Sequence, residues 1–207
     1  MNRTILIFTT LLLCFSQMLT AQNKPTGSIV MTTKPLSEQR ELLDLFRFQN
    51  IDYYQTTIKG NIKGKYYSIT VKEIWNGKVT KTDTIFDSSK GELAFIGKHK
   101  TDSLKFSLMA SKAGKKKLKV NFSLDRVGLY REFKCTTSES YSLRDVGTEM
   151  TIEPGKPFYT FAYILPYKLD NGGSSWCAVE SSGKDIEQWG QEFGIKHYIL
   201  FEMNFFE

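Results

Sequence analysis

The stretch KYYSITVKEIWNGKVTKTDTIF, residues 65–86, carries the clearest indication of the fold. Both halves are rich in β-branched and aromatic residues, and apolar residues alternate with polar ones from Tyr67 to Val71, as in a half-buried strand. Asn76 and Gly77 lie between the halves, and both residue types tolerate the positive φ angles of a two-residue hairpin turn. The pattern predicts an antiparallel β-hairpin.

Further strand-like segments lie on both sides of this hairpin. They cover residues 27–33, 51–60, 92–97, 103–111, 117–124, 130–136, 149–154, 158–167, 176–180 and 195–206. Many short strands separated by turns are typical of a sandwich or a barrel. We therefore predict a mostly β chain that folds as an antiparallel β-sandwich, jelly-roll or immunoglobulin-like, with one or two short helices.

Two segments have helical patterns instead. Residues 37–48 place leucines and a phenylalanine on one face, with Ser37 as the expected cap. In residues 185–194, Asp185 and Gln188 form a capping-box pattern, and Gly194 can end the helix in the left-handed conformation. We expect residues 22–50 to form a partly detached lead-in that carries the first helix.

The first 21 residues have the features of a secretory signal peptide. A short positive start is followed by an apolar run, and Ala21 offers a small residue before Gln22, where we expect cleavage. Residues 22–207 are then expected to form a single β-sandwich domain in the periplasm or outside a bacterial cell. Lipid attachment at Cys14 is disfavoured, because a small residue should precede the cysteine and Leu13 stands there.

The charge and hydropathy of the chain exclude some classes of partner. The formal net charge is +6, and loss of Arg3 with the signal peptide lowers it to about +5, with 22 acids interspersed. This mild excess does not indicate a nucleic-acid binder. No apolar run after the signal peptide approaches the ~18 residues of a membrane helix, so we expect no transmembrane span in the mature chain.

Cys135 and Cys177 are the two cysteines left after export, and we expect them to form a disulfide. A catalytic Cys177 would need a base, and His197 with Glu180 could be drawn in that role. However, His197 shares a strand face with Ile199 and other core residues, and Cys177 does not precede a helix. The disulfide is therefore favoured, and no catalytic residue is assigned.

Metal and cofactor motifs are weak in this sequence. His99 and His197 are far apart, and neither has a second histidine or cysteine at ligand spacing. Asp170 and Asn171 precede two glycines, but the alternating acids of a calcium loop are absent from the sequence. We expect no metal site and no cofactor.

A cluster of lysines marks the turn near Gly114. It comprises Lys112, Lys115, Lys116, Lys117 and Lys119. The cluster can contact an anionic glycan or lipid headgroup, but solvated lysines at a hairpin tip also discourage pairing between sheet edges. Aromatic residues do not interleave with these lysines as nucleic-acid binding would require.

Aromatic residues near predicted loop ends are the candidate binding residues. Trp75 precedes one turn, and Tyr167 and Trp176 flank another. Exposed tyrosine and tryptophan offer flat surfaces with a polar edge, which suit sugars or protein partners. The sequence favours a non-catalytic binding module for a glycan or a protein, with a secreted hydrolase using carboxylates from separate strands, or a structural assembly subunit, as alternatives.

Overall fold

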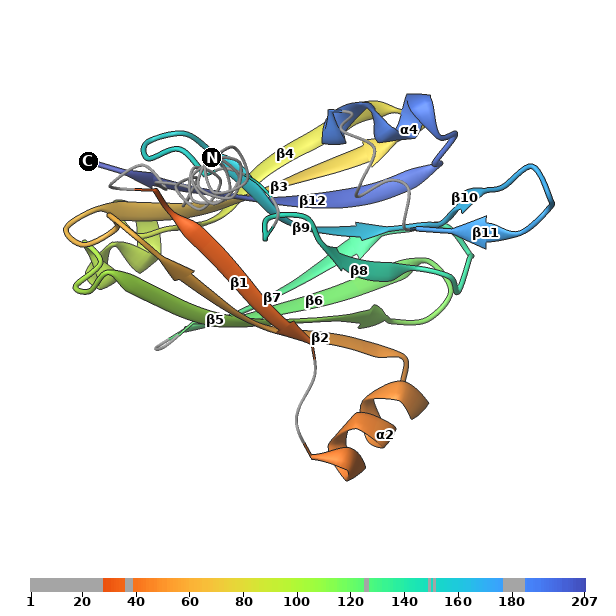
Figure 1. The fold of residues 1–207 in the computed structure, drawn as a ribbon, viewed down its shortest axis with the longest axis horizontal. Helices are drawn as coiled ribbons and strands as arrows, with labels where there is room; N and C mark the ends of the chain where they lie inside the picture. Colours follow the sequence, from red (N-terminus) through yellow and green to blue (C-terminus); the bar gives the residue numbers. More distant parts are fainter. Residues whose placement is uncertain (1–27, 36–38, 125–126, 149, 151, 177–184) are drawn as a thin grey trace, which may run out of the picture.

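The computed structural model describes residues 28–35, 39–124, 127–148, 150, 152–176 and 185–207, which form two five-stranded antiparallel sheets packed face to face (Figure 1). The first sheet contains, in spatial order, β1 (Val30–Pro35), β2 (Ile51–Lys59), β5 (Ser103–Lys112), β6 (Lys117–Leu124) and β7 (Val127–Lys134). The second contains β4 (Lys78–Asp87), β3 (Tyr66–Trp75), β12 (His197–Phe206), β9 (Phe158–Ile164) and β8 (Ser142–Asp145). The prediction of a mostly β chain with antiparallel sheets is confirmed.

The smaller elements lie at the ends of the sheets. They are the helices α2 (Arg40–Phe48), η1 (Gly91–Ile96), η2 (Ile186–Gln188) and α4 (Trp189–Glu192), and the two-stranded ribbon β10 (Tyr167–Lys168) with β11 (Ser174–Ser175). Among the described residues, no helix is both long enough and apolar enough to cross a membrane.

The hairpin predicted from residues 65–86 is confirmed as β3 and β4. Asn76 and Gly77 have φ angles of 50° and 73°, the left-handed values of the predicted turn. A Cβ added to Gly77 would lie 2.4 Å from the side chain of Gln191, whose Nε2 donates to the Gly77 carbonyl oxygen at 2.9 Å. Gly77 is therefore required both by the turn and by the packing of α4 against it.

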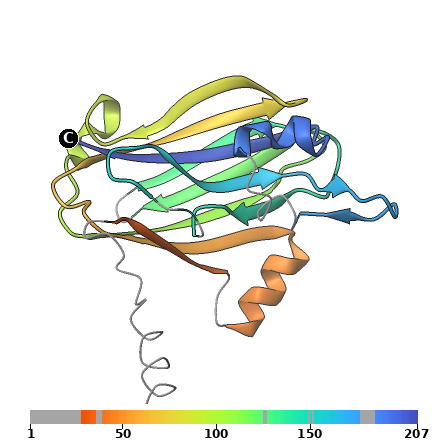
Figure 2. The same ribbon diagram turned by 45° about the horizontal axis from the view of Figure 1, so that its top comes forward.

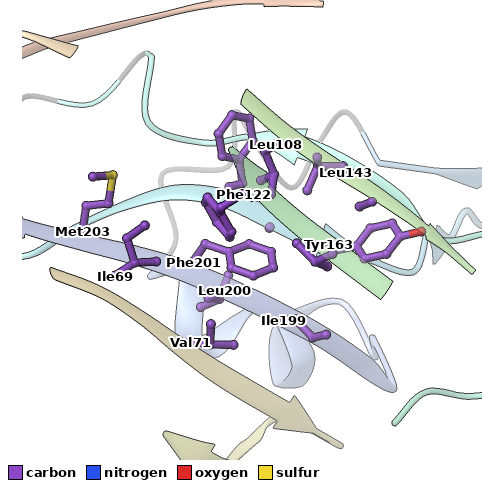
Figure 3. Close-up of a cluster of buried hydrophobic side chains, with 14 of the residues drawn as sticks. Ile69, Val71, Leu108, Phe122, Leu143, Tyr163, Ile199, Leu200, Phe201 and Met203 are labelled. Carbon is purple, nitrogen blue, oxygen red and sulfur yellow. The ribbon is translucent and has the colours of Figure 1, made fainter. Parts of the chain in front are cut away.

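The inner faces of the two sheets share one hydrophobic core (Figure 3). Phe122 of β6 meets Phe201 of β12 with ring centroids 5.3 Å apart, and Tyr54 of β2 meets Phe161 of β9 at 5.4 Å. β12 is the central strand of its sheet and runs between β3 and β9 over most of its length. The first five residues of β12 are all buried, whereas buried and half-buried residues alternate over the last five, and the strand predicted there is confirmed.

A charged cluster fastens the η2–α4 segment to the outer face of the second sheet. Lys72 Nζ donates to Glu187 Oε1 at 2.7 Å, to Glu202 Oε2 at 3.0 Å and to the Tyr159 hydroxyl at 2.7 Å. Burial alone would lower the pKa of Lys72, but these three partners together raise it above its usual value. We call Lys72, Tyr159, Glu187 and Glu202 the Lys72 cluster.

The cap predicted at Asp185 is confirmed, because its side chain accepts a hydrogen bond from the Glu187 amide at 3.1 Å. Gly194 has a φ angle of 65°, as expected of a left-handed residue at a helix end. For the first helix, the expected cap Ser37 lies outside the described residues, and Gln39 stands at the N-cap position without a side-chain cap bond. None of the residues of α2 is buried.

The strand predicted at residues 92–97 is wrong, because Gly91–Ile96 form the 3-10 helix η1. Gly91 and Gly97 have φ angles of 70° and 66°, so the chain turns out of the extended conformation on both sides of this short apolar run. β8 was not predicted, because only four residues form it.

Other predicted segments fall partly outside the description. Within residues 149–154, Ile152 forms an isolated bridge with Ile29, and residues 149 and 151 are not described. The signal peptide with Cys14, and residues 177–180 of the predicted strand 176–180, also lie outside the described residues.

Candidate functional site

A cavity of about 320 Å³ opens at the end of the molecule where β2, β8 and β12 begin and β5, β7 and β9 end. Figure 1 places α2, the β10–β11 ribbon and α4 at this same end. The cavity is lined by aromatic rings and charged groups from five separate segments. Its lining consists of Phe46, Arg47, Asn50, Ile51, Asp52, Tyr53, Tyr54, Lys112, Glu139, Tyr141 and Tyr163. We call it the Asp52 cavity.

The junction between α2 and β2 positions Asp52. Asn50 has a φ angle of 51°, a left-handed conformation that asparagine tolerates better than most residues, and β2 begins at the next residue. Because side chains alternate along a strand, Asp52 has the same inward phase as Thr56 and Ile58, which are buried. The strand therefore carries a carboxyl group to the open end of the core.

Asp52 is held in an environment that disfavours its charge. Its Oδ2 accepts a hydrogen bond from the Leu143 amide of β8 at 2.9 Å. Burial raises the pKa of Asp52 to about 6, and it outweighs the lowering effects of the Leu143 amide and the Arg144 charge. The carboxyl can therefore change its protonation state within one pH unit of neutrality.

Tyr163 of β9 lies between the core and the cavity. Figure 3 shows its ring at the margin of the core cluster, with the hydroxyl group directed away from the other labelled side chains. Burial raises the pKa of Tyr163, and the negative charge of Asp52 raises it further. Tyr163 thus stays a neutral hydroxyl that can donate a hydrogen bond.

A buried histidine–tyrosine pair lies behind the cavity wall. His197 Nδ1 is 2.7 Å from the Tyr141 hydroxyl, which also accepts a hydrogen bond from the Thr136 amide at 3.1 Å. Burial lowers the pKa of His197 to about 4, so the imidazole is neutral at pH 7. Its Nε2 has no hydrogen-bond partner among the described residues.

An ion pair forms part of the cavity rim. Lys112 Nζ donates to Glu139 Oε1 at 2.6 Å and to the Thr137 carbonyl oxygen at 3.0 Å. The Lys112 side chain is 10% exposed, whereas that of Glu139 is 79% exposed. The lysine is therefore anchored, while the carboxylate can turn toward a ligand.

The three aromatic residues chosen from the sequence lie at the same end of the molecule, and all are half-buried. The Trp75 ring packs on His197 with centroids 4.0 Å apart, and the Tyr167 ring packs on Phe193 at 5.5 Å. Trp176 Nε1 donates to the carbonyl oxygen of Ile164 at 3.4 Å. These residues surround the cavity end without lining the cavity itself.

The predicted lysine cluster is divided by ion pairs. Lys112 belongs to the cavity rim, and Lys117 Nζ donates to Glu132 Oε2 at 2.7 Å. No ion pair joins Lys115, Lys116 or Lys119 to a residue that the structure describes. The hairpin tip thus retains three unpaired positive charges.

Of the two cysteines in the predicted disulfide, the structure describes Cys135 but not Cys177. Cys135 is buried and forms no disulfide with a described residue, and burial raises the pKa of its thiol. Cys177 and Glu180 lie outside the described residues. The disulfide between Cys135 and Cys177 therefore stays a prediction, whereas the placement of His197 on the core face is confirmed.

Sequence reasoning did not select Asp52, Tyr141, Tyr163 or Glu139. One pattern could have indicated Asp52, because a carboxylate stands in phase with Thr56 and Ile58 on a strand whose inward positions are otherwise uncharged. Glu139, Tyr141 and Tyr163 are far from Asp52 in the sequence and come close to it only when the chain is folded.

The cavity combines groups that can bind a polar ligand. Asp52 and Glu139 offer acceptors, Arg47 and Lys112 offer donors, and the tyrosines offer ring faces and hydroxyl groups. Within the described part of the chain, no group of three His, Cys, Asp or Glu side chains is arranged to hold a metal ion.

Comparison with known protein families, with curated proteins and with solved structures gives no match for this chain.

Proposed function

We propose that the chain is an exported, non-catalytic binding module that holds a sugar unit of a glycan in the Asp52 cavity. The observation that carries the proposal is the composition of this cavity, where aromatic rings surround a partly buried carboxyl group in about 320 Å³ of space. That volume lies at the lower end of ordinary ligand pockets. A small concave site suits a sugar ring better than it suits the flat surface of a protein partner.

Several features support the choice of a sugar. Tyrosine faces pack against the apolar face of a pyranose ring, and carboxylates and lysines exchange hydrogen bonds with its hydroxyl groups. Trp75, Tyr167 and Trp176 surround the same end and can contact neighbouring sugar units. Export through the signal peptide at residues 1–21 would place this site where glycans occur. The proposal includes a β-sandwich of jelly-roll or immunoglobulin-like type as the scaffold.

The experiment is an oligosaccharide array probed with labelled residues 22–207, followed by calorimetry on the best-bound oligosaccharide. We expect Asp52→Asn to weaken binding at least tenfold, because an amide preserves the shape but not the charge of the acceptor. Lys117→Gln is the matched control, since Lys117 is exposed and pairs with Glu132 away from the cavity. Absence of binding across the array, or equal affinities of both variants, would refute the proposal.

One observation favours a second candidate, a glycoside hydrolase. Asp52, with a pKa of about 6, and Glu139 line the same cavity, and glycoside hydrolysis uses one protonated and one ionised carboxyl group. Mass spectrometry of the bound oligosaccharide after prolonged incubation separates the two candidates. Intact sugar supports the binding module, whereas cleavage that is lost in both Asp52→Asn and Glu139→Gln supports the hydrolase.

A further inference from the structure

A second and larger hollow, of about 1310 Å³, follows the outer face of the first sheet. Residues of β1, β2, β5 and β6 and the segment 95–101 line it. The helix α2 reaches this face at one end, where the rings of Phe46 and Tyr53 lie 5.4 Å apart (Figure 2), and Phe95 and Ile96 of η1 also line the hollow. Five exposed lysines line the hollow: Lys34, Lys59, Lys98, Lys100 and Lys105. We call it the lysine groove.

Most of the positive charge of the groove is uncompensated: Lys98 lies near the Glu207 carboxylate and the Tyr66 ring, and the other four lysines form no ion pair with a described carboxylate. None of the described lining residues is aspartate or glutamate, and no ion pair joins any of the five lysines to a described residue. Seven lysines elsewhere do have carboxylate partners: Lys65, Lys72, Lys81, Lys90, Lys112, Lys117 and Lys156. A groove lined by one sign of charge concentrates ligands of the opposite sign.

The groove also contains a hydroxyl group without a described partner. Ser103 lines the groove in phase with Lys105 and Ser107, and its side-chain oxygen is buried and has no hydrogen-bond partner among the described residues. Buried polar groups in folded proteins are normally satisfied by protein, water or a ligand. The Ser103 hydroxyl therefore marks a position where a polar ligand or its bound water can donate or accept a hydrogen bond.

The strand register arranges polar side chains in a row across the sheet. Lys34 lies opposite Gln55, Gln55 opposite Ser107, and Ser107 opposite Ser123, on four neighbouring strands. Neighbouring strands lie about 4.8 Å apart, so the row repeats polar groups at a regular short interval. A linear polymer of small polar units can lie along such a row and contact each strand in turn.

We propose that the lysine groove binds an acidic polysaccharide, a chain of sugar units that bear carboxylate groups. The lysines pair with the carboxylates, and the threonine, serine and glutamine side chains bond with the sugar hydroxyl groups. Phe95, which is 74% exposed at the rim, offers a face for a sugar ring. The hydroxyl-rich row favours a sugar over a lipid, and the groove does not have the series of exposed aromatic rings on which nucleic-acid bases stack. The proposal does not depend on the Asp52 cavity.

The test uses residues 22–207 and two polymers with the same sugar backbone, polygalacturonate and its methyl ester, in which a methyl group removes the charge of each carboxylate. We expect polygalacturonate to bind and the uncharged ester to bind at least tenfold more weakly, with affinity falling as salt rises. The groove variant replaces Lys98, Lys100 and Lys105 with glutamine. The control variant replaces Lys115, Lys116 and Lys119 with glutamine, which removes the same charge from exposed positions at the hairpin between β5 and β6.

The expected result is at least a tenfold loss of affinity for polygalacturonate in the groove variant and less than a twofold loss in the control variant. Asp52→Asn should retain the wild-type affinity, which separates this groove from the cavity. Equal losses in the two lysine variants would show attraction by net charge and would overturn the proposal. It would also be overturned by equal binding of the methyl ester, by absence of binding, or by stronger binding to phosphatidylglycerol vesicles or single-stranded DNA.

Discussion

The Lys72 cluster and the Asp52 cavity both hold partly buried ionisable groups, but they satisfy those groups very differently. In the Lys72 cluster, one ammonium group donates to two carboxylates and a tyrosine hydroxyl. At the Asp52 cavity, Asp52 accepts a hydrogen bond from a backbone amide, but burial still disfavours its charged form. His197 has one ring nitrogen without a hydrogen-bond partner among the described residues.

The difference separates a structural role from a functional one. A charged cluster whose members are all paired fastens one segment to another, as the Lys72 cluster does for η2 and α4. A partly buried carboxyl group that has no cationic partner at hydrogen-bond distance among the described residues, as at Asp52, lowers the stability of the folded state at neutral pH. Such a residue is characteristic of a ligand site, where binding supplies the missing interactions.

The largest expected effect comes from breaking the paired cluster. Lys72→Met should lower the free energy of unfolding at pH 7 by about 2–3 kcal/mol, because Glu187 and Glu202 lose their shared partner while partly buried. Urea denaturation followed by tryptophan fluorescence measures the change. The double variant Lys72→Met/Glu187→Gln should recover part of the loss, and an unchanged midpoint for Lys72→Met would contradict the structural role of the cluster.

Removing the charge of Asp52 at the cavity should raise the free energy of unfolding, whereas the Lys72 substitution lowers it. The folded-state pKa of Asp52, about 6, lies above the ordinary value of 3.8, so its contribution to stability is full below pH 3.8 and is lost as pH rises through 6. Asp52→Asn should therefore raise the free energy of unfolding at pH 8 by about 1–3 kcal/mol, with the difference vanishing near pH 4. Chemical denaturation at both pH values tests this, and a less stable variant at pH 8 would show that the carboxylate is structural.

His197 should act against Asp52 on acidification. Its folded-state pKa of about 4 lies below the ordinary value of 6.5, so its contribution to stability is lost as pH falls from 6.5 toward 4. The two effects oppose each other, and the wild-type stability should vary little across this range. The free energy of unfolding of His197→Gln should therefore rise by about 1–2 kcal/mol on acidification from pH 6.5 to 4. Thermal denaturation of both proteins at several pH values provides the comparison, and parallel curves would contradict it.

The smallest effect is expected where an ion pair lies outside both regions. Lys117 pairs with Glu132 on the exposed side of β6 and β7, where water screens the charges. Lys117→Gln should leave the melting temperature unchanged within error. A clear decrease would mean that exposed pairs stabilise this fold, and the contrast between the Lys72 cluster and the Asp52 cavity would lose its meaning.

Local sequence patterns predicted much of the fold. The Asn76-Gly77 turn, the Asp185 cap and the final strand were recognised because each depends on residues that are neighbours in the chain. The segment 92–97 was misassigned because a short apolar run is compatible with either a strand or a helix, and the flanking glycines decide between them. β8 was missed because four residues are too few to show a period.

The candidate site was much less predictable than the strands. The sequence showed that Trp75, Tyr167 and Trp176 each adjoin a turn, but it did not show their packing partners. Asp52 meets Leu143, and Tyr141 meets His197, across separations of 91 and 56 residues. Contacts between residues so far apart in the sequence leave no periodic pattern within a single segment.

The sequence alone therefore determined the strand-rich character of the chain, its principal turn and its caps, because backbone propensity and side-chain alternation act over a few residues. The tertiary structure alone decided which strands became neighbours, and with them the Asp52 cavity, the Lys72 cluster and the lysine groove. The physical reason is that burial, and with it the pKa values of Asp52 and His197, depends on atoms supplied by distant parts of the chain.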